Sequence, residues 1–212
     1  MNIALIGASG QVGRFLMQEV LERNHRVTAL GTDPSKLEPA PNLIARKVDV
    51  LDTTALANEV RGHDAVLSAF SGHAHSDVLG YYLQGMRSII AAVKHAGVPR
   101  LLVVGGAGSL EVQPGIQLLD TPQFPAQWRA TAEGARQALM ILRAETELDW
   151  TMLSPSAHLE PGPRTGRYRL GKDTLLQDAN GNSHISLADY AKAMIDELEQ
   201  PRHTRKRFTV GY

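Results

Sequence analysis

The sequence has no cysteine, only 5% aromatic residues and no excess of charge of either sign. The absence of cysteine excludes disulfides, thiolate metal sites and cysteine nucleophiles. The 22 basic and 22 acidic residues cancel to a formal net charge of +0, so no general attraction to nucleic acid or to an anionic membrane is expected. No apolar run is long enough to cross a bilayer, and no basic segment precedes the first apolar run, so a signal peptide is not expected.

Short apolar runs alternate with helical patterns along almost the whole chain of 212 residues, of which 43% are hydrophobic. This alternation predicts one α/β domain, residues 1–212, with a doubly wound parallel sheet, helices on both faces and a small C-terminal substrate-side region. In such a sheet, ligands bind at the carboxyl ends of the strands. Strands are predicted at 3–6, 26–30, 43–48, 65–70, 101–104, 150–153 and 208–210, and the main helices at 53–60, 77–96, 126–146 and 187–199.

The first apolar run leads directly into the spacing Gly-x-x-Gly-x-x-Gly, formed by Gly7, Gly10 and Gly13, and then into an amphipathic pattern. A strand, a glycine turn and a helix N-terminus together bind the pyrophosphate of a dinucleotide, since the turn lets backbone N–H groups come close to it. The alternative is a tight turn with incidental glycines, but the strand before it and the helix after it favour the dinucleotide site. The residues expected to contact the cofactor here are Gly7, Ser9, Gly10, Gln11, Val12 and Gly13.

Two stretches without a clear period are predicted to be substrate-side loops, 110–125 and 154–184. Within the second, residues 168–170 and 174–177 are expected to pair as a hairpin across 171–173. Ser186 and Asp189 have the spacing of a capping box, which predicts the start of the last helix.

The chain resembles the atypical short-chain dehydrogenase/reductases, and more narrowly their NADH-flavin reductase-like and biliverdin reductase B-like branch. The resemblance rests on the glycine motif, on the stretch 49–52, on Leu102–Ser109, on Leu153–Ala157, on Ile185–Ala191 and on the C-terminal Arg207–Tyr212. It implies a Rossmann fold and a nicotinamide cofactor. It also implies cofactor contacts beyond the glycine turn, at Asp49, Val50, Ala69, Phe70, Ser71, Gly105, Gly106, Pro155, Ser156 and Ala157.

One feature departs from the main short-chain dehydrogenases, which use a Tyr-x-x-x-Lys pair to protonate a carbonyl oxygen. Tyr81 and Tyr82 are followed four residues later by Gly85 and Met86, and the helix from residue 126 offers no such pair. A carbonyl reductase or epimerase of the usual mechanism is therefore disfavoured. Reduction of a flavin or quinone fits better, because such a ring accepts hydride directly and water supplies the later proton.

The choice between NAD and NADP depends on the residues after the second strand. Related sequences often carry an arginine for the 2′-phosphate where this chain has Thr32. Asp33 could bind the ribose hydroxyls of NAD or only cap a helix, and Lys36 or Arg14 could reach a phosphate. The sequence therefore leaves the choice between NAD and NADP open.

Five further side chains are candidates on the acceptor side. Ser109 could lie beside the nicotinamide or bond only its own loop. His158 could donate to a flavin or be a solvated loop residue. His73 is expected to contact cofactor or substrate. His73 and His75 have a spacing that can bind metal, but nothing completes a ligand set, so no metal is expected. Trp128 is either a wall of the acceptor pocket or part of the core.

The leading hypothesis is an NAD(P)H-dependent reductase of a flavin or a similar planar acceptor, with Ser109 and His158 as the catalytic candidates. The alternative is a non-catalytic NAD(P)-binding redox sensor of the NmrA type, and an epimerase or dehydratase is less favoured. The expected partner is a small-molecule acceptor, without nucleic acid or membrane. The protein is expected to be cytoplasmic, as a monomer or homodimer.

Overall fold

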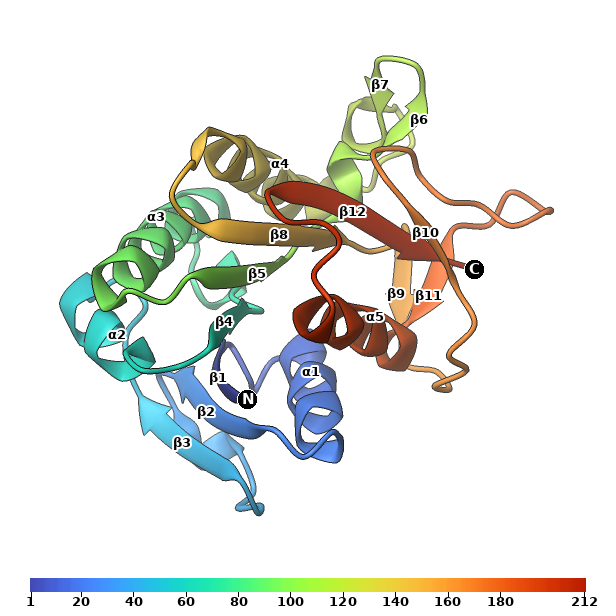
Figure 1. The fold of residues 1–212 in the computed structure, drawn as a ribbon. Helices are drawn as coiled ribbons and strands as arrows, with labels where there is room; N and C mark the ends of the chain where they lie inside the picture. The colour runs from blue at the N-terminus through green and yellow to red at the C-terminus, as the bar shows by residue number, and fades with distance from the viewer.

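A mainly parallel sheet of eight strands runs through the centre of the molecule (Figure 1). The computed structural model describes the backbone of residues 1–212 and every side chain except that of Ala74. Only β10 is antiparallel to its neighbour, so the predicted parallel sheet is confirmed. In spatial order the strands are β10 (Arg169–Gly171), β12 (Lys206–Gly211), β8 (Asp149–Ser154), β5 (Arg100–Val104), β4 (Ala65–Ser68), β1 (Asn2–Ile6), β2 (Arg26–Gly31) and β3 (Leu43–Lys47).

The strand order reverses beside β1, which lies between β2 and β4. The chain builds outward from β1 to β2 and β3, then returns to β4 and builds outward on the other side. Loops leaving β1 and β4 therefore diverge, and a crevice opens at the carboxyl ends of these two strands. The central strands are buried on both faces, as their continuous apolar runs predict.

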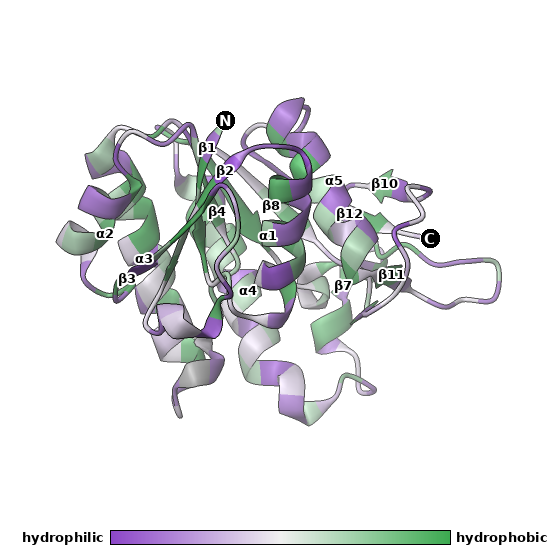
Figure 2. Cartoon of the chain, turned by 90° about the horizontal axis from the view of Figure 1, so that it is seen from below, coloured by the Kyte–Doolittle hydropathy of each residue, from purple (hydrophilic) through white to green (hydrophobic). Residues whose placement is uncertain are grey.

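Helices cover both faces of the sheet. One face packs against α1 (Gln11–Glu22) and α5 (Leu187–Glu199), and the other against α2 (Thr53–Val60), α3 (Val78–Ala96) and α4 (Arg129–Ala144). Asp52, Asp77 and Ser186 cap α2, α3 and α5 with their side-chain oxygens, which explains where these helices begin. Figure 2 shows the strands largely hydrophobic between the two helix layers, so the core has two halves separated by the sheet.

The segments outside this framework differ from the sequence prediction. The expected hairpin of 168–170 with 174–177 is wrong: β10 pairs with β12, and Thr174 bridges Glu111 instead. The segment 110–125 contains a small hairpin, β6 (Glu111–Gln113) and β7 (Ile116–Gln117), while β9 (His158–Glu160) pairs with β11 (His184–Ser186). Short 3-10 turns lie at 34–36, 72–74, 107–109, 118–120 and 126–128. Local pattern did not reveal these pairings, because each partner is distant in sequence or very short.

No helix among the described parts of the chain has both the length and the apolar character needed to span a membrane.

Two buried carboxylates attach the C-terminal region to the framework. Glu19 on α1 accepts two hydrogen bonds from the guanidinium of Arg164, at 2.7 and 2.8 Å. Asp189, fully buried in the first turn of α5, accepts from Gly166 N at 2.8 Å, from Tyr212 Oη at 2.7 Å and from Thr165. The capping-box spacing thus predicted the helix start correctly. The Asp189 carboxylate, however, binds the segment 165–166 instead of the Ser186 N–H.

We predict that Asp189→Asn lowers the free energy of unfolding by about 2–3 kcal/mol, because an amide nitrogen would face donors that lose their acceptor. Burial alone would raise the pKa of Asp189, but hydrogen bonds led by that from Thr165 lower it below the ordinary value. A depressed pKa stabilises the fold above the unfolded-state pKa of about 3.9, and the contribution is lost as the pH falls through the folded pKa.

Urea unfolding at pH 7 and pH 3 measures this effect. The difference between parent and variant should shrink at the lower pH. Glu22→Gln on the exposed face of α1 is the control and should change stability by less than about 0.5 kcal/mol. Equal stability of the parent and Asp189→Asn at pH 7 would contradict the assignment.

Candidate functional site

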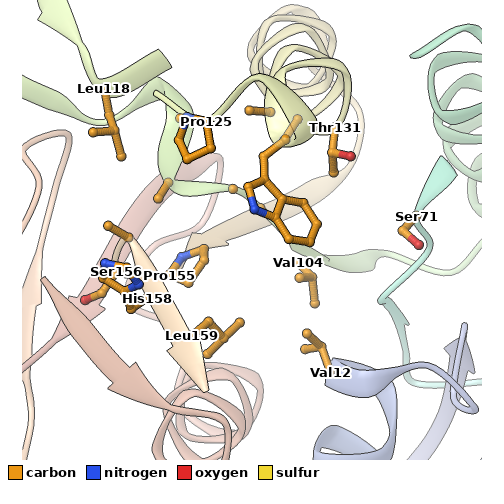
Figure 3. A pocket seen from close by; sticks show the side chains of 18 of the residues that line it. Val12, Ser71, Val104, Leu118, Pro125, Thr131, Pro155, Ser156, His158 and Leu159 are labelled. Atoms are coloured by element: carbon orange, nitrogen blue, oxygen red, sulfur yellow. The ribbon is translucent and has the colours of Figure 1, made fainter. Parts of the chain in front are cut away.

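A cavity of about 730 Å³ opens at the carboxyl ends of β1, β4, β5 and β8 (Figure 3). Its lining comes from the first turn of α1, from the segments after the three other strands, from α3, from the segment 118–128 and from one face of α4. No aspartate, glutamate, lysine or arginine is among the lining residues. They are Gly10, Gln11, Val12, Ala69, Phe70, Ser71, His73, Tyr82, Val104, Gly105, Gly106, Ala107, Gly108, Leu118, Thr121, Gln123, Phe124, Pro125, Trp128, Thr131, Ala132, Ala135, Pro155, Ser156, Ala157, His158 and Leu159.

The three glycines of the turn have three different geometric roles. Gly7 adopts φ +79°, and a Cβ there would stand 2.7 Å from the carbonyl oxygen of Ala69. A Cβ on Gly13 would stand 2.0 Å from Gly7 O, so this glycine lets α1 pack on the turn. A Cβ on Gly10 would meet only Gly7 O, at 3.3 Å, and otherwise open space. Gly7 and Gly13 therefore shape the turn, while Gly10 leaves room at the cavity.

The first turn of α1, with its unpaired backbone N–H groups, borders this open space in the cavity. Gly10 is the N-cap and provides no side-chain cap, and the first turn of the helix carries no acidic residue. Gln11 and Val12 line the cavity directly. A helix start with free N–H groups and a partial positive charge binds phosphate oxygens. These residues fit the pyrophosphate of a dinucleotide.

The floor of the cavity is built by backbone at the ends of β5 and β8. Gly105 N donates to Leu153 O at 2.8 Å, which holds the two strand ends together. The Ser156 hydroxyl donates to Val210 O at 2.9 Å and is buried, so it anchors its loop to β12. Figure 3 shows Val12, Val104 and Leu159 around the same space, with Pro155 and His158 beside it. The predicted residues Ala69, Phe70, Ser71, Gly105, Gly106, Pro155, Ser156 and Ala157 all line this one cavity.

The segment 118–128 forms the opposite wall. Trp128 lines the cavity with 52% of its surface exposed, so the core alternative for this residue is wrong. The His73 ring stands edge-on to the indole, with 6.1 Å between ring centroids, and its Nε2 lies 3.5 Å from Thr131 Oγ1. The position of Phe124 is supported by Arg129, whose guanidinium carbon lies 5.9 Å from the ring centroid. An aromatic wall thus faces the glycine-lined floor.

The two histidines of the loop after β4 point to different partners. His73 faces Trp128, whereas the His75 ring stacks on Tyr81 with centroids 5.2 Å apart and accepts from Asp77 N. Across the described side chains, no three His, Cys, Asp or Glu side chains gather where they could hold a metal ion.

The structure separates the two catalytic candidates, so the expectation that Ser109 and His158 both lie on the acceptor side is wrong. His158 lines the cavity as an exposed side chain, with its Nδ1 3.8 Å from Glu160 Oε1. Ser109 is 5% exposed and does not line the cavity. Its hydroxyl accepts from Arg207 Nη1 at 3.2 Å, and that guanidinium also binds Asp173. The buried arginine draws Ser109 away from the cavity, and no local pattern signals this contact between residues 98 positions apart.

The residues predicted around the adenosine half of the cofactor do not line the cavity, and neither do the remaining residues of the glycine turn. Asp33 caps a short 3-10 turn by accepting from Ser35 N at 3.2 Å, which agrees with the capping role considered for it. Its carboxylate also pairs with Lys36 at 3.7 Å. Thr32 is exposed after β2. Not lining the cavity are Gly7, Ser9, Gly13, Thr32, Asp33, Lys36, Asp49 and Val50. For Thr32, Lys36, Asp49 and Val50 the cofactor contact stays a prediction.

Sequence reasoning missed much of the acceptor-side wall. Thr131, Ala132 and Ala135 of α4 share a face with Trp128, which was itself predicted, and their spacing of three and four residues was a readable signal. The loop contributors Leu118, Thr121, Gln123, Phe124 and Pro125 had no such signal beyond the general expectation for 110–125. Tyr82, on α3, was considered only for the lysine that it lacks.

These features define a dinucleotide-binding Rossmann protein: a parallel sheet with the strand order reversed beside β1, a glycine turn and an open helix start. The model of the NAD(P)H-binding family matches residues 7–201. The chain belongs to this family.

Similar proteins cover its whole length. The uncharacterised protein YwnB of Bacillus subtilis is 42% identical over 99% of this chain and 98% of its own. A Bacteroides thetaiotaomicron structure, proposed to be an epimerase, is 44% identical with a TM-score of 0.93 and covers 100% of this chain and 96% of its own. A Streptococcus pneumoniae structure, proposed to be an NADH-flavin reductase, is 33% identical with a TM-score of 0.88 and covers 100% of this chain and 99% of its own.

We predict that Gly10→Val abolishes binding of NADH and NADPH and leaves the fold intact. The side chain would occupy the space where phosphate oxygens must approach the helix start, while meeting only one backbone oxygen of the free protein. Calorimetric titration measures the affinity, and circular dichroism with a thermal melt measures the fold.

Gly13→Val is the contrasting variant. Its side chain would overlap the backbone of Gly7, so it should lower the Tm strongly, by a mechanism that Gly10→Val does not share. Unchanged affinity of Gly10→Val for both cofactors would remove the dinucleotide assignment of the turn.

We predict that Thr32→Arg shifts the cofactor preference toward NADPH, because a guanidinium binds a 2′-phosphate bidentately. The exposed position leaves room for the longer side chain. The measurement is the ratio of the Kd values for NADPH and NADH. A ratio that does not move would mean that Thr32 does not face the adenosine ribose.

Proposed function

We propose that this protein is an NAD(P)H-dependent reductase that transfers hydride to a flavin or a similar planar, quinone-like acceptor. The observation that carries the proposal is the cavity itself. It joins a helix start suited to pyrophosphate with an uncharged, aromatic and glycine-lined chamber, and it has no charged side chain that would select a charged substrate group.

The cofactor side follows from the glycine turn. The first turn of α1 holds the pyrophosphate, and the loops after β4, β5 and β8 border the place of the nicotinamide in a Rossmann fold. When bound, NAD(P)H supplies the hydride. The chain contributes position, because two stacked rings must be held at reaction distance with little freedom.

The acceptor side favours a planar ring. Trp128 and Phe124 offer aromatic surface, and Pro155 and Leu159 add apolar surface to the same cavity. From α4 and the 3-10 turn before it, a tryptophan, a threonine and two alanines reach the cavity. This face therefore carries no tyrosine with a lysine four residues later. An acceptor that takes hydride without simultaneous protonation of a carbonyl suits such a site, and water then supplies the proton.

The names of the two structural relatives point to different reactions. The Streptococcus pneumoniae protein, proposed to be an NADH-flavin reductase, agrees with our proposal. The Bacteroides thetaiotaomicron protein is proposed to be an epimerase, a reaction for which the missing tyrosine–lysine pair is a disadvantage. The chemistry of the cavity lining therefore supports the reductase.

Steady-state oxidation of NADH and NADPH with riboflavin, FMN and menadione tests the proposal. We expect saturable turnover of at least one acceptor, which the Gly10→Val variant lacks. Tight cofactor binding without turnover of any acceptor would contradict the reductase and favour the NmrA-type sensor.

Two alanine variants distinguish a side chain that lines the cavity from one that stabilises the fold outside it. His158→Ala should lower kcat/KM for the acceptor by about tenfold, the scale of one lost hydrogen bond, with cofactor affinity unchanged. Ser109→Ala should leave that ratio unchanged and lower the Tm, since the hydroxyl binds the buried Arg207 and not the cavity. The opposite pattern would reverse the two roles.

A further inference from the structure

Tyr82 is the one tyrosine that lines the cavity in the described part of the chain. It projects from α3, is 5% exposed, and its ring stacks on Phe70 with centroids 5.8 Å apart and planes 6° apart. Gly134 of α4 accommodates the other edge of the ring, because a Cβ there would stand 2.8 Å from Tyr82 Cδ1. The ring is therefore held firmly between two helices and the loop after β4.

The Tyr82 hydroxyl has no hydrogen-bond partner among the described residues. Buried side-chain oxygens and nitrogens without partners are, within the described chain, Ser68 Oγ and Arg100 Nε. The Tyr82 oxygen is not among these fully enclosed atoms, so it retains accessible surface. Since Tyr82 lines the cavity and is otherwise buried, this surface opens on the cavity.

Tyr190 and Tyr81 provide the comparison. The Tyr190 hydroxyl, buried on the other side of the sheet, donates to Leu153 O at 2.7 Å and is satisfied within the fold. Tyr81, one residue before Tyr82, is partly exposed and stacks on His75 outside the cavity. Burying a phenol without a hydrogen-bond partner costs stability, which the Tyr190 hydroxyl avoids and the Tyr82 hydroxyl does not. Burial raises the pKa of Tyr82, so the phenol keeps its proton at physiological pH and is available as a hydrogen-bond donor.

We propose that the Tyr82 hydroxyl donates a hydrogen bond to a carbonyl oxygen of a ring bound in the cavity. This proposal rests on the reductase function proposed above. The carbonyl belongs either to the planar acceptor or to the carboxamide of the nicotinamide, and the two sources give different kinetics.

On the acceptor, the hydrogen bond assists the reaction directly. The hydride leaves the cofactor with its electron pair and forms a bond to the acceptor ring. The negative charge then spreads to the ring's carbonyl oxygen, where the phenol donor stabilises it. Tyr82 keeps its own proton, and water protonates the reduced ring on release. On the carboxamide, the same donor would orient the nicotinamide and strengthen its binding.

Tyr82→Phe is the test, because it removes only the hydroxyl and keeps the stacked ring. We expect the Tm to stay the same or rise, since no hydrogen bond of the fold is lost. If the acceptor is the partner, kcat/KM for menadione and riboflavin should fall about tenfold to a hundredfold while the Kd of NADPH stays constant. If the carboxamide is the partner, the Kd of NADPH should rise by a similar factor.

Two control variants provide reference values for the effects of Tyr82→Phe. Tyr81→Phe should change neither kinetics nor stability. Tyr190→Phe should lower the Tm by about 2–4 °C, the shift expected from one net hydrogen bond in a chain of this size. A Tyr82→Phe variant that loses Tm as Tyr190→Phe does would show a structural hydroxyl and overturn the proposal.

Unchanged kcat/KM together with unchanged cofactor affinity in Tyr82→Phe would also overturn it. If the parent protein turns over no acceptor, the reductase proposal fails, but the hydrogen bond remains testable. Titrations of parent and Tyr82→Phe with NADPH, riboflavin and menadione would then decide it by affinity alone, and equal affinities for all three would overturn it.

Discussion

The close approach of three backbone segments at the carboxyl end of β1 is the constraint on which the rest of the site depends. Gly7 lies against the carbonyl of Ala69, and Gly13 lies over the carbonyl of Gly7, with no room for a Cβ at either position. This contact brings β1, the start of α1 and the loop after β4 into one turn. The helix start is thereby aimed at the crevice that the reversed strand order opens.

Buried polar groups hold segments that lie outside the cavity lining. Arg207 joins the loop after β5 to Asp173, while Glu19 and Asp189 fix the segment 164–166 through Arg164, Thr165 and Gly166. These hydrogen bonds satisfy the buried charged groups that make them. They also explain why the cavity lining itself can be almost free of charge: the charges that order the loops point away from it.

The site has two parts of different character, the start of α1, which is suited to phosphate groups, and the uncharged chamber beside it. In the proposed function, the helix start and the glycine turn would bind the charged half of a dinucleotide, and the chamber would position rings through flat contacts. Within the chamber, polar groups are few: two histidines at the rim, some hydroxyl and amide groups, and a buried tyrosine hydroxyl without a partner. Specificity for an acceptor would thus come from shape and from single hydrogen bonds.

The sequence by itself determined the order of the main strands and helices, the glycine turn, the start of the last helix at Ser186 and the loops that border the cavity, because these are encoded in local periodicity and backbone chemistry. The tertiary structure alone decided which loop side chains face the cavity. Ser109 turned to Arg207, Trp128 turned outward to the cavity, and Tyr82 entered it from another helix. Each of these outcomes depends on contacts between residues far apart in the chain, which no local pattern records.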